Sequence, residues 1–162
     1  WLNYTYSRSF NKISIGPNYT QQVNNGDWYA TNYDRPHAFN AALVFNQAKM
    51  HDFSFNFSYS TGRPFTVPSA FIKSNGVTYP FYNFRNNSRI PDYHRLDFSW
   101  NIYNPVNKDR RFKGNWNFTI YNIYGRKNAY SIYLKTEGTQ TKAYKSTIFG
   151  APIISLSYNL KF

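Results

Sequence analysis

The stretch HDFSFNFSYSTGRPF, residues 51–65, alternates aromatic with small polar side chains over its first ten residues. One parity holds Phe53, Phe55, Phe57 and Tyr59, and the other holds Ser54, Asn56, Ser58 and Ser60. Successive side chains of a β-strand point to opposite faces of the sheet, so this alternation predicts a strand with one apolar and one polar face. The pattern suits both a soluble sheet with an apolar core and a membrane barrel with an apolar outside. The fold therefore depends on which face meets water.

The composition excludes several classes of protein. The chain has 162 residues, of which 22% are aromatic and 16% charged, and it has no cysteine, which excludes a disulfide framework and a thiolate metal site. No run approaches the roughly 20 apolar residues of a membrane helix, so any spanning segment would consist of strands. The alternation is already under way at Trp1, and we therefore expect the chain to be part of a longer protein.

The chain is strongly basic, with 19 Lys and Arg against 7 Asp and Glu and a net charge of +12. Such a balance is typical of proteins with nucleic acid or an anionic membrane surface as partner. The basic residues are scattered through expected connections, for example residues 83–89, 108–114 and 125–128. Solvated loops explain this distribution most simply, contact with lipopolysaccharide or an acidic ligand is the alternative, and nucleic acid is not expected as a partner.

Six segments show period-two alternation, and none shows a helical period. They are residues 1–10, 35–46, 52–61, 93–103, 115–124 and 152–162. Long connections (11–34, 62–92, 125–151) alternate with short ones (47–51, 104–114). This alternation is typical of an up-and-down barrel, which has long extracellular loops and short periplasmic turns. With the C-terminus placed in the periplasm, the three long connections are extracellular. Residues 129–135 within the last of them are expected to form a hairpin above the membrane.

The two predicted faces differ in a way that favours the membrane. The apolar parity carries no charge and has Trp and Tyr near the strand ends, where amphipathic rings suit lipid headgroups. The polar parity is mostly Ser and Asn rather than the Lys and Glu of a soluble sandwich, and it suits a hydrated lumen. The sequence thus predicts an all-β, antiparallel, up-and-down transmembrane β-barrel wall. The final ISLSYNLKF adds an alternating end, with Tyr158, Leu160 and Phe162 as candidates for the signal read by the barrel-assembly machinery.

Four stretches, in this order, resemble the C-terminal portion of TonB-dependent outer-membrane transporters of the Bacteroidetes group. They are YSTGRPFTVPSA (59–70), RIPDYHRLDFSW (89–100), GNWNFTIYNIYGRKNAYSIY (114–133) and IFGAPIISLSYNLKF (148–162). The resemblance covers nearly the whole chain and implies the last six strands of a barrel of about 22 strands in the outer membrane of a Gram-negative cell. It also implies a plug and a TonB-binding segment that this chain lacks. The implied partners are outer-membrane lipid and lipopolysaccharide, TonB, and a surface lipoprotein or other outer-membrane subunits.

The candidate site residues are polar side chains expected on the lumen face or at its mouth, and aromatic side chains of the extracellular loops. Arg63 follows a strand and is a candidate for binding an anionic or hydroxylated solute, or a neighbouring carboxylate or phosphate. Arg95 and Asp97 share a face two residues apart, where a structural ion pair is favoured over a ligand clamp. The remaining lumen candidates are Asn56, Asn101 and Asn117, and the loop aromatics, which either stack on sugar rings or pack within the loops, are Trp28, Tyr29, Tyr79, Phe81 and Tyr82.

Catalysis, metal binding and cofactors are not expected. His37, His51 and His94 fall on different segments without an i, i+4 pair, and His51 is expected in a solvated periplasmic turn. No inward Ser has an inward His at matching height, and Gly62 and Gly76 stand alone rather than in a phosphate-binding loop.

The favoured function is energy-coupled uptake of a solute, such as a glycan, a peptide or a metal chelate, with this chain forming part of the barrel wall. One alternative is a non-transporting barrel that serves as a scaffold subunit of a surface or secretion assembly. Another is a complete eight-stranded outer-membrane protein in which residues around 129–135 and 143–149 add two strands. A basic soluble nucleic-acid-binding sheet is the last alternative, and it predicts binding that collapses with salt.

Overall fold

The computed structural model describes residues 1–14, 22–47, 50–103, 113–137 and 140–161. Within these ranges the chain is all-β, with a short 3-10 segment at Asn24–Gly26. The search of the same residues finds no helix long and apolar enough to cross a membrane.

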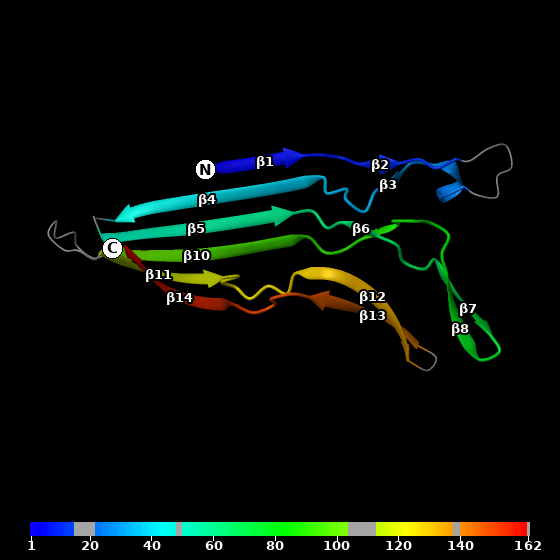
Figure 1. The fold of residues 1–162 in the computed structure, drawn as a ribbon. Helices are drawn as coiled ribbons and strands as arrows, with labels where there is room; N and C mark the ends of the chain where they lie inside the picture. The colour runs from blue at the N-terminus through cyan, green and yellow to red at the C-terminus, as the bar shows by residue number, and fades with distance from the viewer. Residues whose placement is uncertain (15–21, 48–49, 104–112, 138–139, 162) are drawn as a thin grey trace.

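A six-stranded antiparallel sheet forms the body of the molecule, as a single layer of long strands lying side by side (Figure 1). Each of the six segments predicted from the sequence contributes one strand, and the strands are neighbours in the order of the sequence. The strands are β1 (Leu2–Tyr6), β4 (His37–Gln47), β5 (His51–Ser60), β10 (Tyr93–Tyr103), β11 (Lys113–Tyr121) and β14 (Ile153–Lys161).

The register of the strands keeps the two predicted parities on opposite faces. Phe55 lies opposite Leu43 on one side and Phe98 on the other, and Phe98 continues the row to Ile120. The two middle rows of this face, through Phe55 and Phe57, are hydrocarbon, whereas the rows toward its two ends contain Tyr, His and Trp. The end rows include Tyr4, Tyr59 and His94 at the end of the sheet where β4 begins, and His51, Trp116 and Tyr158 at the end where β4 stops. The predicted separation into an apolar and a polar face is therefore confirmed.

The first strand is shorter than the predicted 1–10, and β4 begins at His37 rather than residue 35. Pro36 explains both differences, because it has no N–H with which to continue the ladder beyond the Tyr6–His37 pair. The chain resumes extended structure as β2 (Phe10–Asn11), which pairs with β3 (Tyr29–Ala30) instead of with β4.

The fifth strand starts earlier and ends earlier than the predicted 115–124. β11 ends at Tyr121 because Asn122 takes a left-handed backbone conformation with φ 56°. The Asn122 side chain then ties the turn together, since its Nδ2 donates to the carbonyl oxygens of Arg126 and Phe149, each at 3.1 Å. At the end of the chain, the predicted Phe162 lies outside the described residues.

The connections predicted as long links contain strands of their own. Residues 62–92 hold β6 (Pro64–Phe65) paired with β9 (Ser88–Arg89), and the hairpin of β7 (Ala70–Ser74) and β8 (Val77–Phe81). The sequence analysis missed this hairpin, although Asn75–Gly76, with φ 52° and 77°, is the dipeptide that two-residue hairpin turns favour.

The predicted hairpin within 125–151 is confirmed as β12 (Ala129–Glu137) paired with β13 (Gln140–Thr147). These two strands form a separate sheet, and β11 pairs directly with β14. The alternative of an eight-stranded barrel that counts them as wall strands is therefore wrong.

The sheet has no conventional core. It is open, because β1 and β14 each have one neighbour among the described strands, and no described element covers either face. In the described part of the chain, the buried hydrophobic residues are Tyr29 and Ile90. Both lie in the connections at the hairpin end of the sheet, which is the end from which the β7–β8 and β12–β13 hairpins extend (Figure 1). On the apolar face, Leu43, Ile154 and Leu156 expose 53%, 66% and 65% of their surface.

Candidate functional site

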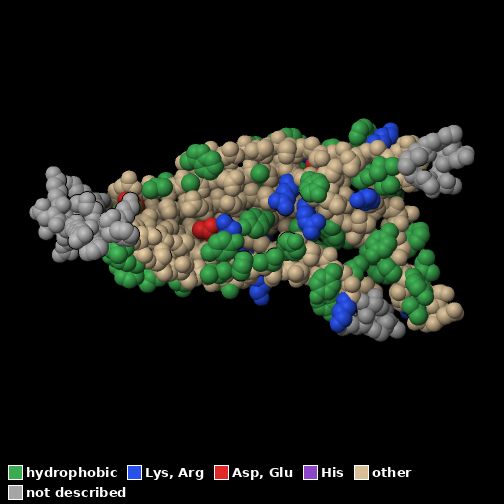
Figure 2. Space-filling view, in the orientation of Figure 1, with side chains coloured by type: hydrophobic (Ala, Val, Ile, Leu, Met, Phe, Trp, Pro, Cys, Tyr) green, Lys and Arg blue, Asp and Glu red, His purple; other side chains and the backbone are tan. Residues whose placement is uncertain are grey.

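The polar face carries a ladder of amides and hydroxyls. Asn56 lies opposite Asp97, and Asn101 lies opposite Asn117, so these four predicted residues do share one face. The Nδ2 of Asn117 donates to Asn101 Oδ1 at 2.6 Å and to Ser99 Oγ at 2.9 Å. In Figure 2, which views this face, hydrophobic side chains are sparse over the long strands and basic ones gather toward the hairpin end.

Arg95 and Asp97 form the ion pair that their spacing predicted, with Arg95 Nη2 2.9 Å from Asp97 Oδ2. The same guanidinium donates to the Tyr93 and Tyr121 hydroxyls and lies 4.0 Å from the centre of the Tyr121 ring. Asp97 accepts a further hydrogen bond from the backbone N–H of Asn122 at 2.9 Å. Because these partners occupy both charged groups, the pair stabilises the sheet at this point.

A pocket of about 430 Å³ lies beyond this pair, at the hairpin end of the polar face. Its walls come from the ends of β4, β5 and β10, from the start of β12 and from the turn before β14. Arg63, one of the candidate residues of the sequence analysis, lines it, and its Nη2 donates to the Tyr130 carbonyl oxygen at 3.1 Å. The sequence analysis missed the second arginine in the wall, Arg35. No periodic pattern signals Arg35, because it lies between a buried carboxylate and a proline.

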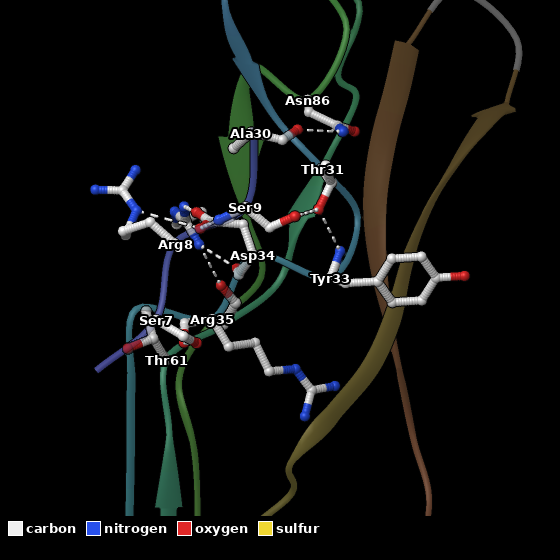
Figure 3. Close-up of polar contacts among 12 residues, drawn as sticks. Ser7, Arg8, Ser9, Ala30, Thr31, Tyr33, Asp34, Arg35, Thr61 and Asn86 are labelled. Atoms are coloured by element: carbon white, nitrogen blue, oxygen red, sulfur yellow. Dashed lines mark hydrogen bonds and ion pairs between the residues drawn. The ribbon is translucent and has the colours of Figure 1, made fainter. Parts of the chain in front are cut away.

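The orientation of Arg35 depends on its neighbour Asp34, whose side chain is buried. The Asp34 carboxylate accepts from the backbone N–H of Ser9 at 2.8 Å, from Arg8 Nε at 3.2 Å and from Arg89 Nη2. Figure 3 shows Arg8 and Ser9 directed toward Asp34, while the Arg35 side chain points away from this cluster. Burial by itself raises the pKa of Asp34, but the hydrogen bonds from Ser9, Arg89 and Arg8 outweigh it and leave the pKa below its ordinary value.

A second carboxylate, Asp92, holds the backbone next to the other pocket arginine, Arg63. Its Oδ1 accepts from the backbone N–H of Gly62 at 2.8 Å, next to Arg63, and its Oδ2 accepts from the Tyr59 hydroxyl at 2.7 Å. The hydrogen bond from Gly62, followed by that from Tyr59, lowers the pKa of Asp92 below its ordinary value. Gly62 is required here because a Cβ at this position would lie 1.7 Å from the Ile90 carbonyl oxygen.

An exposed aromatic residue in a strained conformation forms the pocket wall beside β14. Phe149 has φ 51°, and every other described non-glycine residue with positive φ is an asparagine. Bulky side chains rarely take this conformation, and such strain clusters at functional sites. The Phe149 carbonyl accepts from Asn122, and its ring meets Tyr121 edge-on at 6.2 Å, yet 62% of the residue remains exposed.

The predicted loop aromatics lie elsewhere, and none of them lines this pocket. Trp28, Tyr79, Phe81 and Tyr82 are exposed, with 67%, 54%, 46% and 53% of their surface accessible. Tyr29 is 5% exposed and packs within the loops, so the alternative of loop packing holds for this residue and its assignment to ligand stacking is wrong.

At the C-terminal end, Tyr158 and Leu160 lie on the apolar face and are exposed. The Tyr158 ring packs against Trp116 with centroids 4.8 Å apart and reaches over Gly114, where a Cβ would meet its hydroxyl at 2.0 Å. This arrangement explains why β11 has a glycine opposite β14, and it leaves Tyr158 and Leu160 of the predicted assembly signal exposed.

The three histidines all lie on the apolar face, and each contacts the polar atom of a Tyr or Trp side chain. His37 Nδ1 is 2.8 Å from the Tyr4 hydroxyl, and His94 Nδ1 is 2.7 Å from the Tyr124 hydroxyl. His51 is the first residue of β5 and accepts from Trp100 Nε1 at 3.3 Å, so the prediction that it is solvated in a turn is wrong. A search of the described residues finds no group of three or more His, Cys, Asp and Glu placed to hold a metal ion.

Comparisons of the chain with protein-family models, with curated proteins and with solved structures found no match. The family resemblance of the sequence therefore stays a prediction. The functional proposal rests on the two faces of the sheet and on the pocket at its hairpin end.

Proposed function

We propose that this chain is part of the wall of an outer-membrane barrel that takes up a solute by energy-coupled transport. The observation that carries the proposal is the apolar face of the six-stranded sheet, which no described element covers. Burying one large apolar side chain is worth about 1.5–3 kcal/mol, so a whole face of such residues left in water would be strongly unfavourable. Lipid satisfies this face without a second protein layer.

The distribution of rings on that face supports a bilayer rather than a protein partner. Its middle rows are hydrocarbon, and its end rows carry Tyr, Trp and His, which hydrogen-bond at headgroups. The five longer strands have 9 to 11 residues. At about 3.3 Å per residue and a tilt near 45°, such strands span roughly 20–25 Å, which matches the apolar band of outer-membrane barrels.

The two edges of the sheet support a larger barrel. β1 and β14 each leave one side of the backbone without a partner among the described strands. Unpaired backbone groups are costly in a bilayer, and about eight strands is the smallest barrel that closes. Further strands therefore complete the wall, in line with the roughly 22 strands that the family resemblance implies.

The polar face supports uptake over a scaffold role, since a scaffold needs no pocket toward the lumen. In this orientation the small hairpins face the outside of the cell, among lipopolysaccharide, and the end of β14 faces the periplasm. The pocket then lies at the outer mouth of the lumen, where an incoming solute arrives first. TonB, acting through a segment outside this chain, supplies the energy coupling.

Nitroxide labels on two adjacent residues test the membrane orientation. Residues 1–162 contain no cysteine, and any cysteine in the rest of the full-length protein is first replaced by serine, so that each label has a single site. The full-length protein in lipid vesicles is labelled at Phe55→Cys or, as the matched control, at Asn56→Cys. We expect the label at 55 to be relaxed more by oxygen than by a water-soluble nickel chelate, and the label at 56 to show the reverse. A label at 55 that responds mainly to the nickel chelate would overturn the barrel-wall proposal.

Recovery of the full-length protein from outer membranes tests the coupling to TonB. Uptake predicts that TonB is cross-linked to the protein in energised cells. A barrel that is correctly inserted by the nitroxide criterion but never cross-links to TonB would instead be the scaffold subunit.

A further inference from the structure

We propose that the pocket at the hairpin end of the polar face binds a hydroxylated ring that carries an anionic group, an acidic sugar being the simplest such solute. This inference names the solute class for the uptake function proposed above, and its role in uptake rests on that function. Binding itself depends only on the pocket.

The anionic group would be bound by Arg35 and Arg63. The described residues that line the pocket include these two arginines and no acidic residue. The nearby carboxylates have other partners: Asp34 pairs with Arg8 and Arg89, Asp92 accepts from Gly62 and Tyr59, and Asp97 pairs with Arg95. The two pocket arginines therefore have no described carboxylate partner, and guanidinium groups favour carboxylate and phosphate oxygens.

The rest of the pocket suits a ring with hydroxyl groups. Asn40, Ser58 and Ser60 line its floor from the polar face of β4 and β5 and offer both donors and acceptors. Tyr130 and Phe149 line its sides and are 63% and 62% exposed, so much of their surface remains accessible to the apolar face of a sugar.

The volume and the strain at Phe149 are consistent with a built site. A volume of about 430 Å³ lies in the range of small-molecule sites, roughly 300–1,000 Å³. Phe149 keeps an exposed ring in a conformation that its own backbone disfavours, where an asparagine would fit more easily. Ligand contact explains why an aromatic residue occupies this position.

Calorimetric titration of the full-length protein in detergent tests the inference with three probes. Glucuronate carries a carboxylate, glucose 6-phosphate carries a phosphate, and glucose is the neutral control. We expect at least one anionic probe to bind about tenfold or more tightly than glucose, with an affinity that falls as salt is raised. The comparison of the two anionic probes shows which acidic group the arginines prefer.

Variants connect this binding to the two arginines. Arg35→Gln and Arg63→Gln are each expected to weaken the anionic probe by about tenfold and to leave glucose unchanged. Arg85→Gln removes the same charge from an exposed loop position outside the pocket and is expected to leave all three affinities unchanged. Arg35→Lys, which keeps the charge, serves if Arg35→Gln does not fold, and it is expected to retain part of the preference.

The inference is overturned if no probe binds to the folded protein, if glucose binds as tightly as the anionic probes, or if Arg85→Gln weakens binding as much as Arg35→Gln. These results leave the nitroxide measurement untouched, so the barrel wall can stand while the solute class falls. Conversely, selective anion binding by a protein whose label at residue 55 contacts water would refute the membrane function and leave the pocket assignment standing.

Discussion

Asp34 holds together the loops at the hairpin end of the sheet. Its buried carboxylate joins Ser9, Arg8 and Arg89, and the Arg89 side chain also donates to the Asp34 and Gly62 carbonyl oxygens. We expect Asp34→Asn to destabilise the folded loops by about 3 kcal/mol, because it leaves partly buried guanidinium groups without their counter-charge. Limited proteolysis of the loops measures the effect, and Asp27→Asn, at an exposed position, is the matched control.

The pH dependence of the same loops follows from the direction of two pKa shifts. The folded-state pKa values of Asp34 and Asp92 lie below those of the unfolded chain, so the ionised carboxylates stabilise the folded loops. This contribution is complete above the unfolded pKa of about 4 and is lost as the pH falls through the lower folded values. Protease resistance of the loops is expected to be constant from pH 7 to about 5 and to fall in more acidic solution, with a smaller fall in Asp34→Asn. An unchanged acid profile in that variant would refute this role of Asp34.

Phe149 allows strain and function to be separated. We expect Phe149→Asn to stabilise the protein by about 1 kcal/mol, because asparagine tolerates the left-handed conformation and the exposed ring contributes little packing. The same variant is expected to weaken the anionic probes and glucose alike, since it removes a ring and no charge. Urea unfolding and calorimetry measure the two effects. A variant that is destabilised and binds normally would mean that the ring has a purely structural role.

At the β6–β9 pair, close packing of two backbone segments leaves no room for a side chain at residue 62. Gly62 precedes β6 and lies against the backbone of Ile90, whose N–H donates to the Arg63 carbonyl oxygen at 3.1 Å. We expect Gly62→Ala to force the two segments apart and to cost about 2 kcal/mol. Hydrogen exchange at the Ile90 amide is expected to accelerate by more than tenfold.

Gly76→Ala is the matched control for this element, because a Cβ at that turn meets no atom within 4 Å. Its positive φ still makes the change unfavourable, but the effect is expected to stay within the β7–β8 hairpin. If Gly62→Ala leaves exchange at Ile90 as slow as Gly76→Ala does, the close approach of the two segments is not a real constraint on the fold.

For the molecule as a whole, the two faces of β10 predict opposite responses to charge. Phe98 lies in a middle row of the apolar face, and its neighbour Ser99 lies on the polar face. A lysine at the bilayer midplane costs roughly 2–4 kcal/mol on a lipid-facing strand, so we expect Phe98→Lys to reduce folding into vesicles sharply and Ser99→Lys to be tolerated. Folding yield measured by the heat-modifiable gel shift distinguishes the two. Equal tolerance of both variants would contradict lipid contact on the aromatic face.

The amino-acid sequence by itself determined the number of long strands, their order and the division of each into an apolar and a polar parity. These features are local, because the period of two acts over a few neighbouring residues. The Arg95–Asp97 pair was predictable for the same reason, since two residues separate its members along one strand.

Only the tertiary structure decided where the strands stop, that β12 and β13 stay outside the main sheet, and which side chains form the pocket. Asp34 and Arg89 are 55 positions apart, and Arg63 and Tyr130 are 67 apart, so no pattern along the chain relates them. These residues meet only because the antiparallel register of the long strands places their backbones side by side. The faces of the sheet follow from local alternation, whereas the pocket depends on which loops that register brings together.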